Sequence, residues 1–321
     1  MSNIVKWGIG FIVCLGIVLL TMPSLITYLK KLSLKQTVSE YALEDDQKKA
    51  GTPIMGGILF IAVPVIVSVI LNPSGLLDKK VLIVLLSFIG YGLIGFVDDY
   101  LIAIRKNNDG LTPGKKFAMQ IILAAVVFLL YHDQDLSVAI PFTNISLHLG
   151  LGYAILALFM FSGSSNAVNL TDGMDGLSSG VTIIALVPFA ILAYMKEEFS
   201  LVLVIVCLIA SLLGYLYYNK KPARIFMGDT GSLALGGILA ALAMVLKEEV
   251  ALIFIAGVPV IETVCVLIQQ ISVRTVHKRV FIYTPIHYAF RIKGMPEVNI
   301  VRMFWVVEMI LAIFGLFVAL H

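Results

Sequence analysis

The feature that most constrains this chain of 321 residues is a series of long, separate apolar stretches. A helix of about 20 apolar residues crosses the ~30 Å hydrocarbon layer of a membrane, and stretches of this length recur along the chain. Only 13% of the residues are charged, against roughly 25% in soluble domains. We therefore predict an all-α, polytopic integral membrane protein, and exclude a soluble enzyme, a secreted disulfide scaffold and a disordered chain.

Ten transmembrane helices are expected in one domain that covers residues 1–321. The predicted spans are 5–28, 54–71, 81–97, 117–131, 150–165, 178–195, 201–218, 231–246, 250–271 and 301–320. Alternation of the loops places 18 of the 23 Lys and Arg residues on one face and five on the other. By the positive-inside rule the rich face is cytoplasmic, so both termini are predicted to be extracellular or periplasmic.

Acidic residues gather on the same predicted face. Five aspartates from three distant loops fall at or beside cytoplasmic helix ends: Asp98, Asp99, Asp172, Asp175 and Asp229. Uncompensated acids beside a membrane are costly, and a bound cation is the simplest reason for them. Adjacent carboxylates such as Asp98 and Asp99 repel each other unless they share a cation or a proton. The alternative for this pair is a solvated helix end.

A polar segment follows the fifth predicted span. Asn166, Asn169, Asp172 and Asp175 are spaced three apart, as on one helix face. Gly173 and Gly176 in the same segment favour a mixed end, part loop and part helix terminus. Such an end can bind an anion with backbone N–H groups and sugar hydroxyls or a metal with side chains. A polar turn with Asx caps is the alternative.

Two further motifs suggest phosphate and metal binding. In Phe226–Ser232, Asp229 is either a hard oxygen ligand or the N-cap of the next helix. Lys49, in the stretch KAGTPIMGG, and Lys116 are either phosphate partners or basic flanks of spans.

The last predicted cytoplasmic loop is basic and aromatic. His287 and Arg291 lie in it, a composition that suits a diphosphate or a lipid headgroup, or a generic positive-inside loop. Glu262 and Glu308 lie within spans, where pairing between helices is favoured over catalysis.

The stretches KAGTPIMGG, DDY, NAVNLTDGMDGL and FMGDTGSLALGG together resemble the bacterial phospho-N-acetylmuramoyl-pentapeptide transferase family, within the polyprenyl-phosphate N-acetylhexosamine-1-phosphate transferase superfamily. The resemblance covers essentially the whole chain. It implies a single transmembrane transferase domain of the bacterial inner membrane. It further implies transfer of phospho-MurNAc-pentapeptide from UDP-MurNAc-pentapeptide to undecaprenyl phosphate with Mg²⁺, giving lipid I and UMP. A homodimer surrounded by membrane lipids is expected, with no nucleic acid.

The resemblance also implies roles for individual residues. Asp229 is the expected Mg²⁺ ligand, Asp98 is expected to deprotonate or position the lipid phosphate, and Asp99 is expected to support this site. A larger group is expected to bind substrate, with Lys49 and Lys116 on phosphate and Phe226 stacked on uracil: Lys49, Lys116, Asn166, Asn169, Asp172, Gly173, Asp175, Asn219, Phe226, Gln269 and Arg291.

Two departures from the family pattern affect these roles. The family usually has three consecutive histidines followed by Phe-Glu, whereas only His287 is present here, followed by Tyr288-Ala289-Phe290-Arg291. We expect His287 to be catalytic and to share diphosphate binding with Arg291. Ile54 stands where the family usually has Thr. Two alternatives remain at this point: transfer of GlcNAc-1-phosphate to a polyprenyl phosphate, and a secondary transporter with midplane acids.

Overall fold

The computed structural model describes residues 2–32, 51–105 and 110–321, and this part of the chain is almost entirely helical. Its long helices are α1 (Asn3–Lys31), α3 (Gly57–Leu71), α4 (Lys79–Arg105), α5 (Pro113–Tyr131), α6 (Tyr153–Thr171), α7 (Leu177–Met195), α8 (Phe199–Asn219), α9 (Gly228–Leu246), α11 (Gly257–Thr275) and α13 (Glu297–Ala319). The short elements are η1 (Pro73–Leu77), β1 (Ser137–Ala139), β2 (Ser146–His148), η2 (Gly150–Gly152), α10 (Leu252–Ile255) and α12 (Ile286–Ile292).

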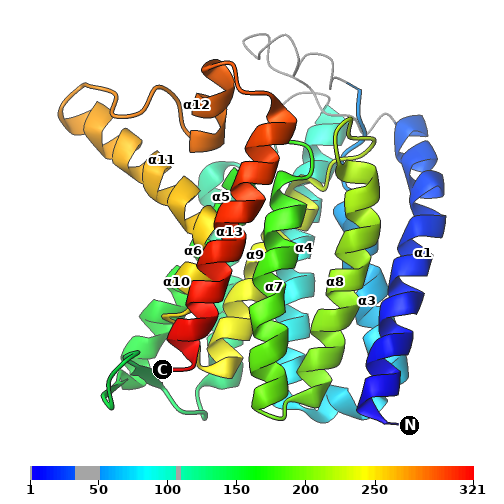
Figure 1. Cartoon of the computed structure of the whole chain (residues 1–321), viewed down its shortest axis with the longest axis vertical. Coiled ribbons are helices and arrows are strands. Elements are labelled where there is room, and N and C mark those ends of the chain that lie inside the picture. Colours follow the sequence, from blue (N-terminus) through cyan, green and yellow to red (C-terminus); the bar gives the residue numbers. More distant parts are fainter. Residues whose placement is uncertain (1, 33–50, 106–109) are drawn as a thin grey trace.

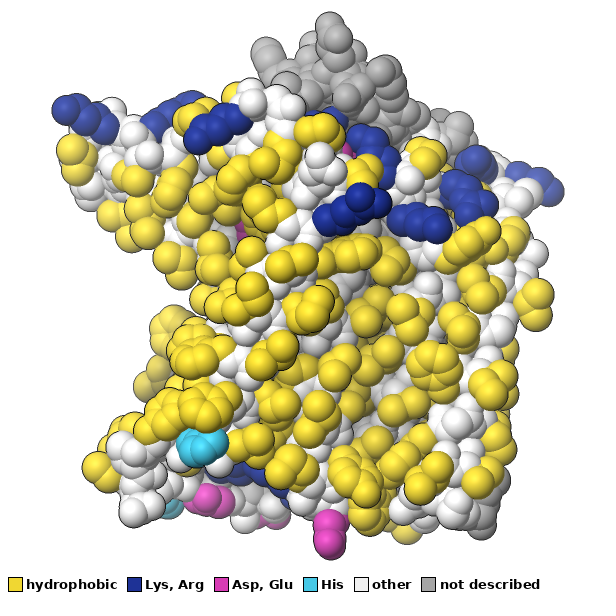
Figure 2. Space-filling model, in the orientation of Figure 1, with side chains coloured by type: hydrophobic (Ala, Val, Ile, Leu, Met, Phe, Trp, Pro, Cys, Tyr) yellow, Lys and Arg dark blue, Asp and Glu magenta, His cyan; other side chains and the backbone are white. Residues whose placement is uncertain are grey.

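Nine of the described helices are long and apolar enough to cross a membrane, and α3 is a shorter apolar helix of 15 residues. Nine of the ten predicted spans correspond to one helix each, so the prediction of an all-α polytopic membrane protein is confirmed. The antiparallel pair β1 and β2 was not predicted. Figure 1 places both chain ends at the same end of the bundle, whereas Lys and Arg gather near the other end in Figure 2. We call these the terminal end and the basic end.

The predicted span 250–271 is wrong as a continuous helix, because the structure breaks it between α10 and α11. Pro259 has no backbone N–H, and the N–H of Val258 donates to Glu308 Oε2 on α13 at 2.7 Å. At the break, the N–H of Val258 has no partner in its own helix and is satisfied by a carboxylate from α13. The predicted pairing of Glu308 between helices is confirmed. Beyond the break, α11 leans away from the bundle (Figure 1).

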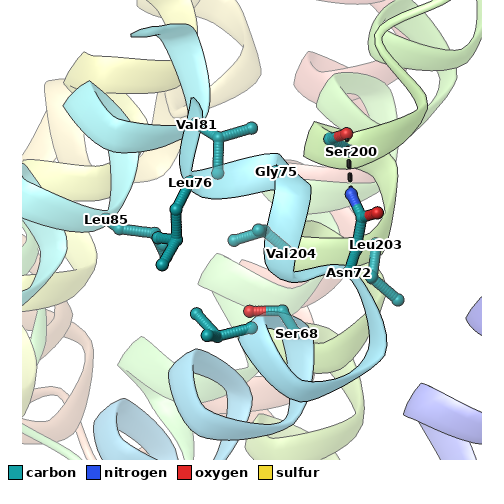
Figure 3. A pocket seen from close by; sticks show the side chains of 10 residues that line it. Ser68, Asn72, Gly75, Leu76, Val81, Leu85, Ser200, Leu203 and Val204 are labelled. Atoms are coloured by element: carbon teal, nitrogen blue, oxygen red, sulfur yellow. Dashed lines mark hydrogen bonds between the residues drawn. The ribbon is translucent and has the colours of Figure 1, made fainter. Parts of the chain in front are cut away.

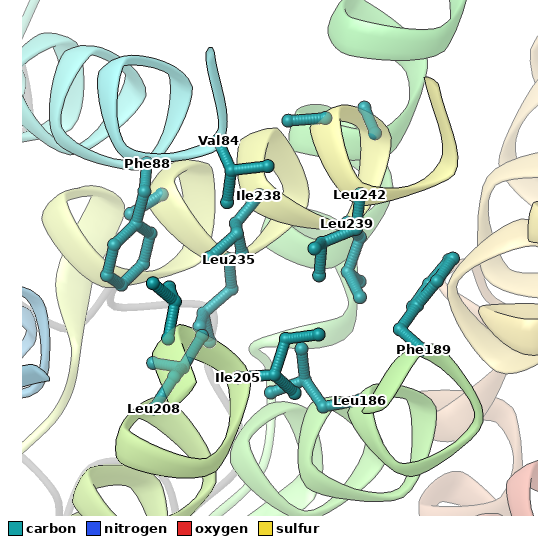
Figure 4. Packing of buried hydrophobic residues seen from close by; sticks show 14 of the residues in the cluster. Val84, Phe88, Leu186, Phe189, Ile205, Leu208, Leu235, Ile238, Leu239 and Leu242 are labelled. Atoms are coloured by element: carbon teal, nitrogen blue, oxygen red, sulfur yellow. The ribbon is translucent and has the colours of Figure 1, made fainter. Parts of the chain in front are cut away.

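Helix α9 is the centre of the bundle, because 94% of its most apolar 18-residue stretch is buried. Figure 4 shows its Leu235, Ile238 and Leu242 packed among side chains of α4, α7 and α8. Neighbouring backbones come close because α9 is rich in small residues. A Cβ on Gly236 would lie 2.3 Å from the carbonyl oxygen of Ser164 on α6. Lipid tails offer no hydrophobic drive between helices, so close packing of this kind stabilises the bundle.

A small pocket lies at the terminal end of the bundle (Figure 3). Asn72 Nδ2 donates to Ser200 Oγ at 3.0 Å there and links the end of α3 to the start of α8. Leu85 of α4 lines this pocket, and 13 residues of that helix, roughly 20 Å, separate Leu85 from Asp98. The pocket is therefore remote from the predicted acids.

We expect Gly95→Ala to destabilise the protein, because a Cβ at Gly95 of α4 would lie 2.0 Å from the carbonyl oxygen of Asp229 on α9. Overpacking against backbone costs about 1–3 kcal/mol. Thermal unfolding in detergent should show a lower midpoint for Gly95→Ala. Gly163→Ala is the matched control, since nothing lies within 4 Å of its Cβ on α6. Equal midpoints for the two variants would contradict the close approach.

Candidate active site

Asp99 holds the start of α9. Its Oδ1 accepts the N–H of Asp229 at 3.0 Å, and its Oδ2 accepts the N–H and the hydroxyl of Thr230 at 2.9 and 2.6 Å. These are unpaired N–H groups at a helix N-terminus, where negative charge is favoured. Asp99 is 3% exposed. Its carboxylate, supplied by α4, is thus occupied as a cap of α9. Thr230, directly after Asp229, provides two of the three donors of this cap.

The structure excludes two alternatives that the sequence left open for the acids. Asp98 and Asp99 do not lie at a solvated helix end, because α4 continues to Arg105 and Asp98 is only 6% exposed. Asp229 is not the N-cap of α9, since Met227 occupies that position and Asp229 lies in the first turn. Its side chain is free to face away from its own helix.

Four side chains from four helices meet at the basic end, and we call them the acidic site: Asp98, Lys116, Asn169 and Asp229. Lys116 Nζ lies 3.3 Å from Asp98 Oδ2 and also pairs with Asp229 Oδ2. Asn169 Nδ2 donates to Asp229 Oδ1 at 2.7 Å, and the N–H of Leu111 donates to Asp98 Oδ1 at 2.5 Å. A single ammonium thus lies between two carboxylates that would otherwise repel each other.

The acidic site has the donors of a hard-cation site. No cluster of three or more His, Cys, Asp or Glu side chains suited to a metal occurs among the described residues. Mg²⁺, however, takes one or two protein carboxylates and completes its shell with water and substrate phosphate. Asp98 and Asp229 supply two carboxylates, and the Lys116 ammonium marks the place between them where positive charge is favoured. The residues present therefore fit Mg²⁺.

The turn after α6 is built by the polar residues around it. Helix α6 ends at Thr171, and Gly176 has a φ of 80°, so the predicted mixed end is confirmed. The N–H of Asp175 donates to Glu297 Oε1 at 2.9 Å, and Asp175 Oδ2 accepts the N–H of Ala223 at 3.0 Å. The Asp175 side chain thus faces the segment between α8 and α9, whereas the Asn169 side chain faces the acidic site.

Asn219 and Asn166 also brace the structure. Asn219 Oδ1 accepts the N–H of Gly176 at 3.1 Å, and its Nδ2 donates to the carbonyl of Ile225 at 3.0 Å. Asn166 Nδ2 donates to Gln120 Oε1 on α5 at 2.9 Å. The amide groups of both side chains therefore form hydrogen bonds that link neighbouring segments. Sequence reasoning missed Gln120 as the partner of Asn166 and Glu297 as the partner of Asp175, because nothing local to Gln120 or Glu297 indicates a contact across the bundle.

Phe226 lies beside the start of α9 and is half-buried. Its N–H donates to the carbonyl of Pro53 at 2.9 Å, and its carbonyl accepts the N–H of Gly56 at 2.8 Å. The segment before α3 is thereby fixed against the segment before α9. Lys49, also predicted to bind phosphate, lies outside the described residues.

His287 is fully buried between α11 and the turn after α6. Its Nδ1 lies 2.9 Å from Glu262 Oε1, which confirms the predicted pairing of Glu262. The hydroxyl of Tyr288 donates to the carbonyl of Gly173 at 3.0 Å. Arg291 instead pairs with Glu297 Oε2 at 3.3 Å. The structure thus gives His287 and Arg291 different acidic partners.

Gln269 lies apart from the acidic site, near the end of α11. Its Oε1 accepts the N–H groups of Val280 and Phe281 at 3.0 Å each, and its Nε2 donates to the carbonyl of Phe281 at 3.1 Å. It lines a cavity of about 310 Å³ together with Arg274, Arg279 and Tyr283. This cavity is basic and lies on the arm that leans out of the bundle.

Comparison with known proteins places these features in a class. Residues 81–247, which include the acidic site, match Glycosyl transferase family 4. The protein is thus a multi-pass membrane transferase, and a secondary transporter is excluded.

Full-length relatives narrow the class. The chain is 41% identical over 302 residues to the phospho-N-acetylmuramoyl-pentapeptide-transferase of Bacillus subtilis, covering 93% of each chain. It is 41% identical over 315 residues to that of Staphylococcus aureus, covering 97% of this chain and 98% of the relative. It is 42% identical over 302 residues to that of Bacillus velezensis, covering 93% of each chain. The chain belongs to the phospho-N-acetylmuramoyl-pentapeptide-transferase family.

We expect Asp99→Asn to destabilise the fold as well as the site. The amide would turn an NH₂ group toward N–H donors of α9, and leaving a buried donor unsatisfied costs about 1–3 kcal/mol. Unfolding in detergent should show this loss. Asp133→Asn is the control, because Asp133 is exposed and pairs only with Lys79 and Gln134 among the described residues. An Asp99→Asn variant as stable as the control would contradict the capping role.

Proposed function

We propose that this protein transfers phospho-MurNAc-pentapeptide from UDP-MurNAc-pentapeptide to undecaprenyl phosphate, giving lipid I and UMP. The observation that carries the proposal is the acidic site at the basic end of the bundle, in which Asp98 and Asp229 flank the Lys116 ammonium and Asn169 donates to Asp229. Phosphoryl transfer brings two anions together, and a site built around positive charge between carboxylates suits that task. The names of the full-length relatives support the choice of sugar.

The proposed reaction is a direct displacement at the β-phosphorus. An oxygen of the lipid phosphate forms a bond to this phosphorus, and the bond to the bridging oxygen of UMP breaks, so UMP leaves with the electron pair. A phosphate monoester with a second pKa near 6 is largely a dianion at neutral pH and needs little help from a base. Asp98 is therefore assigned to positioning the lipid phosphate, and Lys116 to attracting both phosphates.

Mg²⁺ would be held by Asp229 together with Asp98. When bound it supplies positive charge that screens the phosphate oxygens. Lys116 would then be released from the carboxylates to meet phosphate. Asn169 keeps the Asp229 carboxylate oriented through its 2.7 Å hydrogen bond.

The uridine end is assigned to the segment beside the acidic site. Phe226 stacks on uracil, and Asp172 and Gly173 bind nearby, at the turn that Asp175 and Asn219 hold in shape. The basic end faces the cytoplasm of a bacterial inner membrane, both termini lie outside, and two copies form a homodimer. The segregation of Lys and Arg supports this orientation.

The proposed function is tested by supplying the purified protein with Mg²⁺, a polyprenyl phosphate and one nucleotide sugar at a time. UDP-MurNAc-pentapeptide should release UMP, whereas UDP-GlcNAc should not. Release of UMP from UDP-GlcNAc would instead indicate transfer of GlcNAc-1-phosphate. Without lipid acceptor no UMP should appear, since the displacement is direct. Stoichiometric UMP with sugar phosphate retained on Asp98 would instead show a covalent route.

Asp229→Asn should nearly abolish turnover while leaving the protein folded. The substitution removes one charge from a hard-cation site, which weakens both metal binding and screening of the phosphates. UMP release is measured across a Mg²⁺ titration, with the unfolding midpoint as the control for folding. Full activity at an unchanged Mg²⁺ requirement would remove Asp229 from the metal role.

A further inference from the structure

Glu262 of α11 and His287 of α12 form a contact sealed from solvent. Both side chains are 0% exposed, and Glu262 Oε1 lies 2.9 Å from His287 Nδ1. The same carboxylate accepts the N–H of Ile286 at 2.6 Å and the N–H of His287 at 3.2 Å. These are the first two residues of α12. Glu262 therefore caps α12 and receives the ring of its second residue with one carboxylate.

This arrangement selects the ring nitrogen that carries the proton. Backbone N–H groups only donate, so both oxygens of Glu262 act as acceptors at this helix start. Nδ1 then donates its own proton to Glu262, and Nε2 is left for another partner. A carboxylate fixes the tautomer of a histidine in the same way in other enzymes.

Nε2 points at the turn after α6. It is buried and has no hydrogen-bond partner among the described residues. A Cβ on Gly173 would lie 2.3 Å from Nε2 and would cover it, so a side chain at this position would close the approach. A buried ring nitrogen without a partner is costly, which indicates that it binds something absent from the free protein.

We propose that Glu262 is a positioning residue that orients His287 so that Nε2 meets a diphosphate oxygen of the nucleotide sugar at the Gly173 turn. This inference rests on the proposed function. On the doubly protonated ring Nε2–H donates to the anionic oxygen, and the Glu262 carboxylate balances the imidazolium charge. Glu262 touches no substrate and acts through His287 alone.

The test is a double-mutant cycle on kcat/KM for UMP release, with Glu262→Gln, His287→Ala and the double variant. A glutamine has one acceptor oxygen and two donors, so it cannot satisfy the three donors that face Glu262. Glu262→Gln should lower kcat/KM by at least roughly tenfold. In the His287→Ala background the same change should alter kcat/KM by no more than about twofold, because the residue through which Glu262 acts is gone. If the two single variants lowered kcat/KM by factors whose product equals the loss in the double variant, the two residues would act independently and the inference would be overturned.

Two further variants keep the cycle decisive if Glu262→Gln folds poorly. Glu262→Asp keeps an acceptor carboxylate, so it should lose less kcat/KM than Glu262→Gln in the wild-type background and change kcat/KM by no more than about twofold with His287→Ala. Glu308→Gln is the matched control, since Glu308 is also 0% exposed on a membrane helix and accepts a backbone N–H. Glu308→Gln should lower kcat/KM by the same factor in the wild-type and His287→Ala backgrounds. If Glu262→Gln also lowered kcat/KM by the same factor in both backgrounds, the inference would be overturned.

A readout without turnover separates this inference from the proposed function. Nitrogen-15 NMR of histidine-labelled protein, with His287→Ala to identify the signals, should show the neutral ring protonated on Nδ1. Glu262→Gln should abolish this single preference. A wild-type ring protonated on Nε2 would overturn the inference even if UMP is released. Wild-type protein that releases no UMP but shows the Nδ1 tautomer would overturn the proposed function and the diphosphate ligand, and leave the tautomer assignment standing.

Discussion

The structure depends on the contact between the Asp99 carboxylate and the N-terminus of α9. The contact is possible because Gly95, one turn earlier on α4, has no Cβ, so the two backbones meet. Three hydrogen bonds then fix the first turn of α9 in depth and rotation. Asp229 lies within that turn, and its direction toward Asp98 follows from the fixed rotation. The acidic site is thus a consequence of how α4 and α9 pack, and the neighbouring aspartates have different tasks.

The same physical device recurs at two other helix starts. Glu308 of α13 accepts an N–H from the first turn of α11, and Glu262 of α11 accepts two from the start of α12. In each case a carboxylate from one helix satisfies N–H groups of another, where the helix dipole favours negative charge. An ionisable group inside a membrane protein is costly unless it is paired. These three acids are paired with backbone, which leaves Asp98 and Asp229 as the acids that Lys116 must balance.

The bundle was predictable from sequence because hydropathy and helix length report directly on the membrane. Nine of the ten predicted spans correspond to one helix each, and the turn after α6 was anticipated from Gly173 and Gly176. The break between α10 and α11 was not predicted, although Pro259 lies beside it, because the carboxylate that satisfies the N–H of Val258 belongs to Glu308, about 50 residues further along the chain. Among the acids, sequence identified the set but not the division of labour. Asp98 and Asp99 are neighbours, and only the packing of α4 on α9 decides that one caps a helix while the other faces Lys116.

The polar residues of the turn after α6 show why sequence spacing does not distinguish side chains of the acidic site from side chains that hold the turn in place. Asn169 and Asp175 belong to the same three-residue pattern, yet Asn169 bonds to Asp229 and Asp175 accepts the N–H of Ala223. The difference arises because α6 ends at Thr171, so Asp175 lies beyond the helix and faces a different neighbour. Asn169, within the helix, therefore points to the acidic site, whereas Asp175, beyond it, holds the turn against the segment after α8 and the start of α13. Gly173 is where the two regions meet, since the acidic site lies toward α6 and the ring of His287 lies against the turn. The nucleotide sugar that we propose to bind at this turn would contact both α6, whose Asn169 orients Asp229, and α12, whose His287 Glu262 orients.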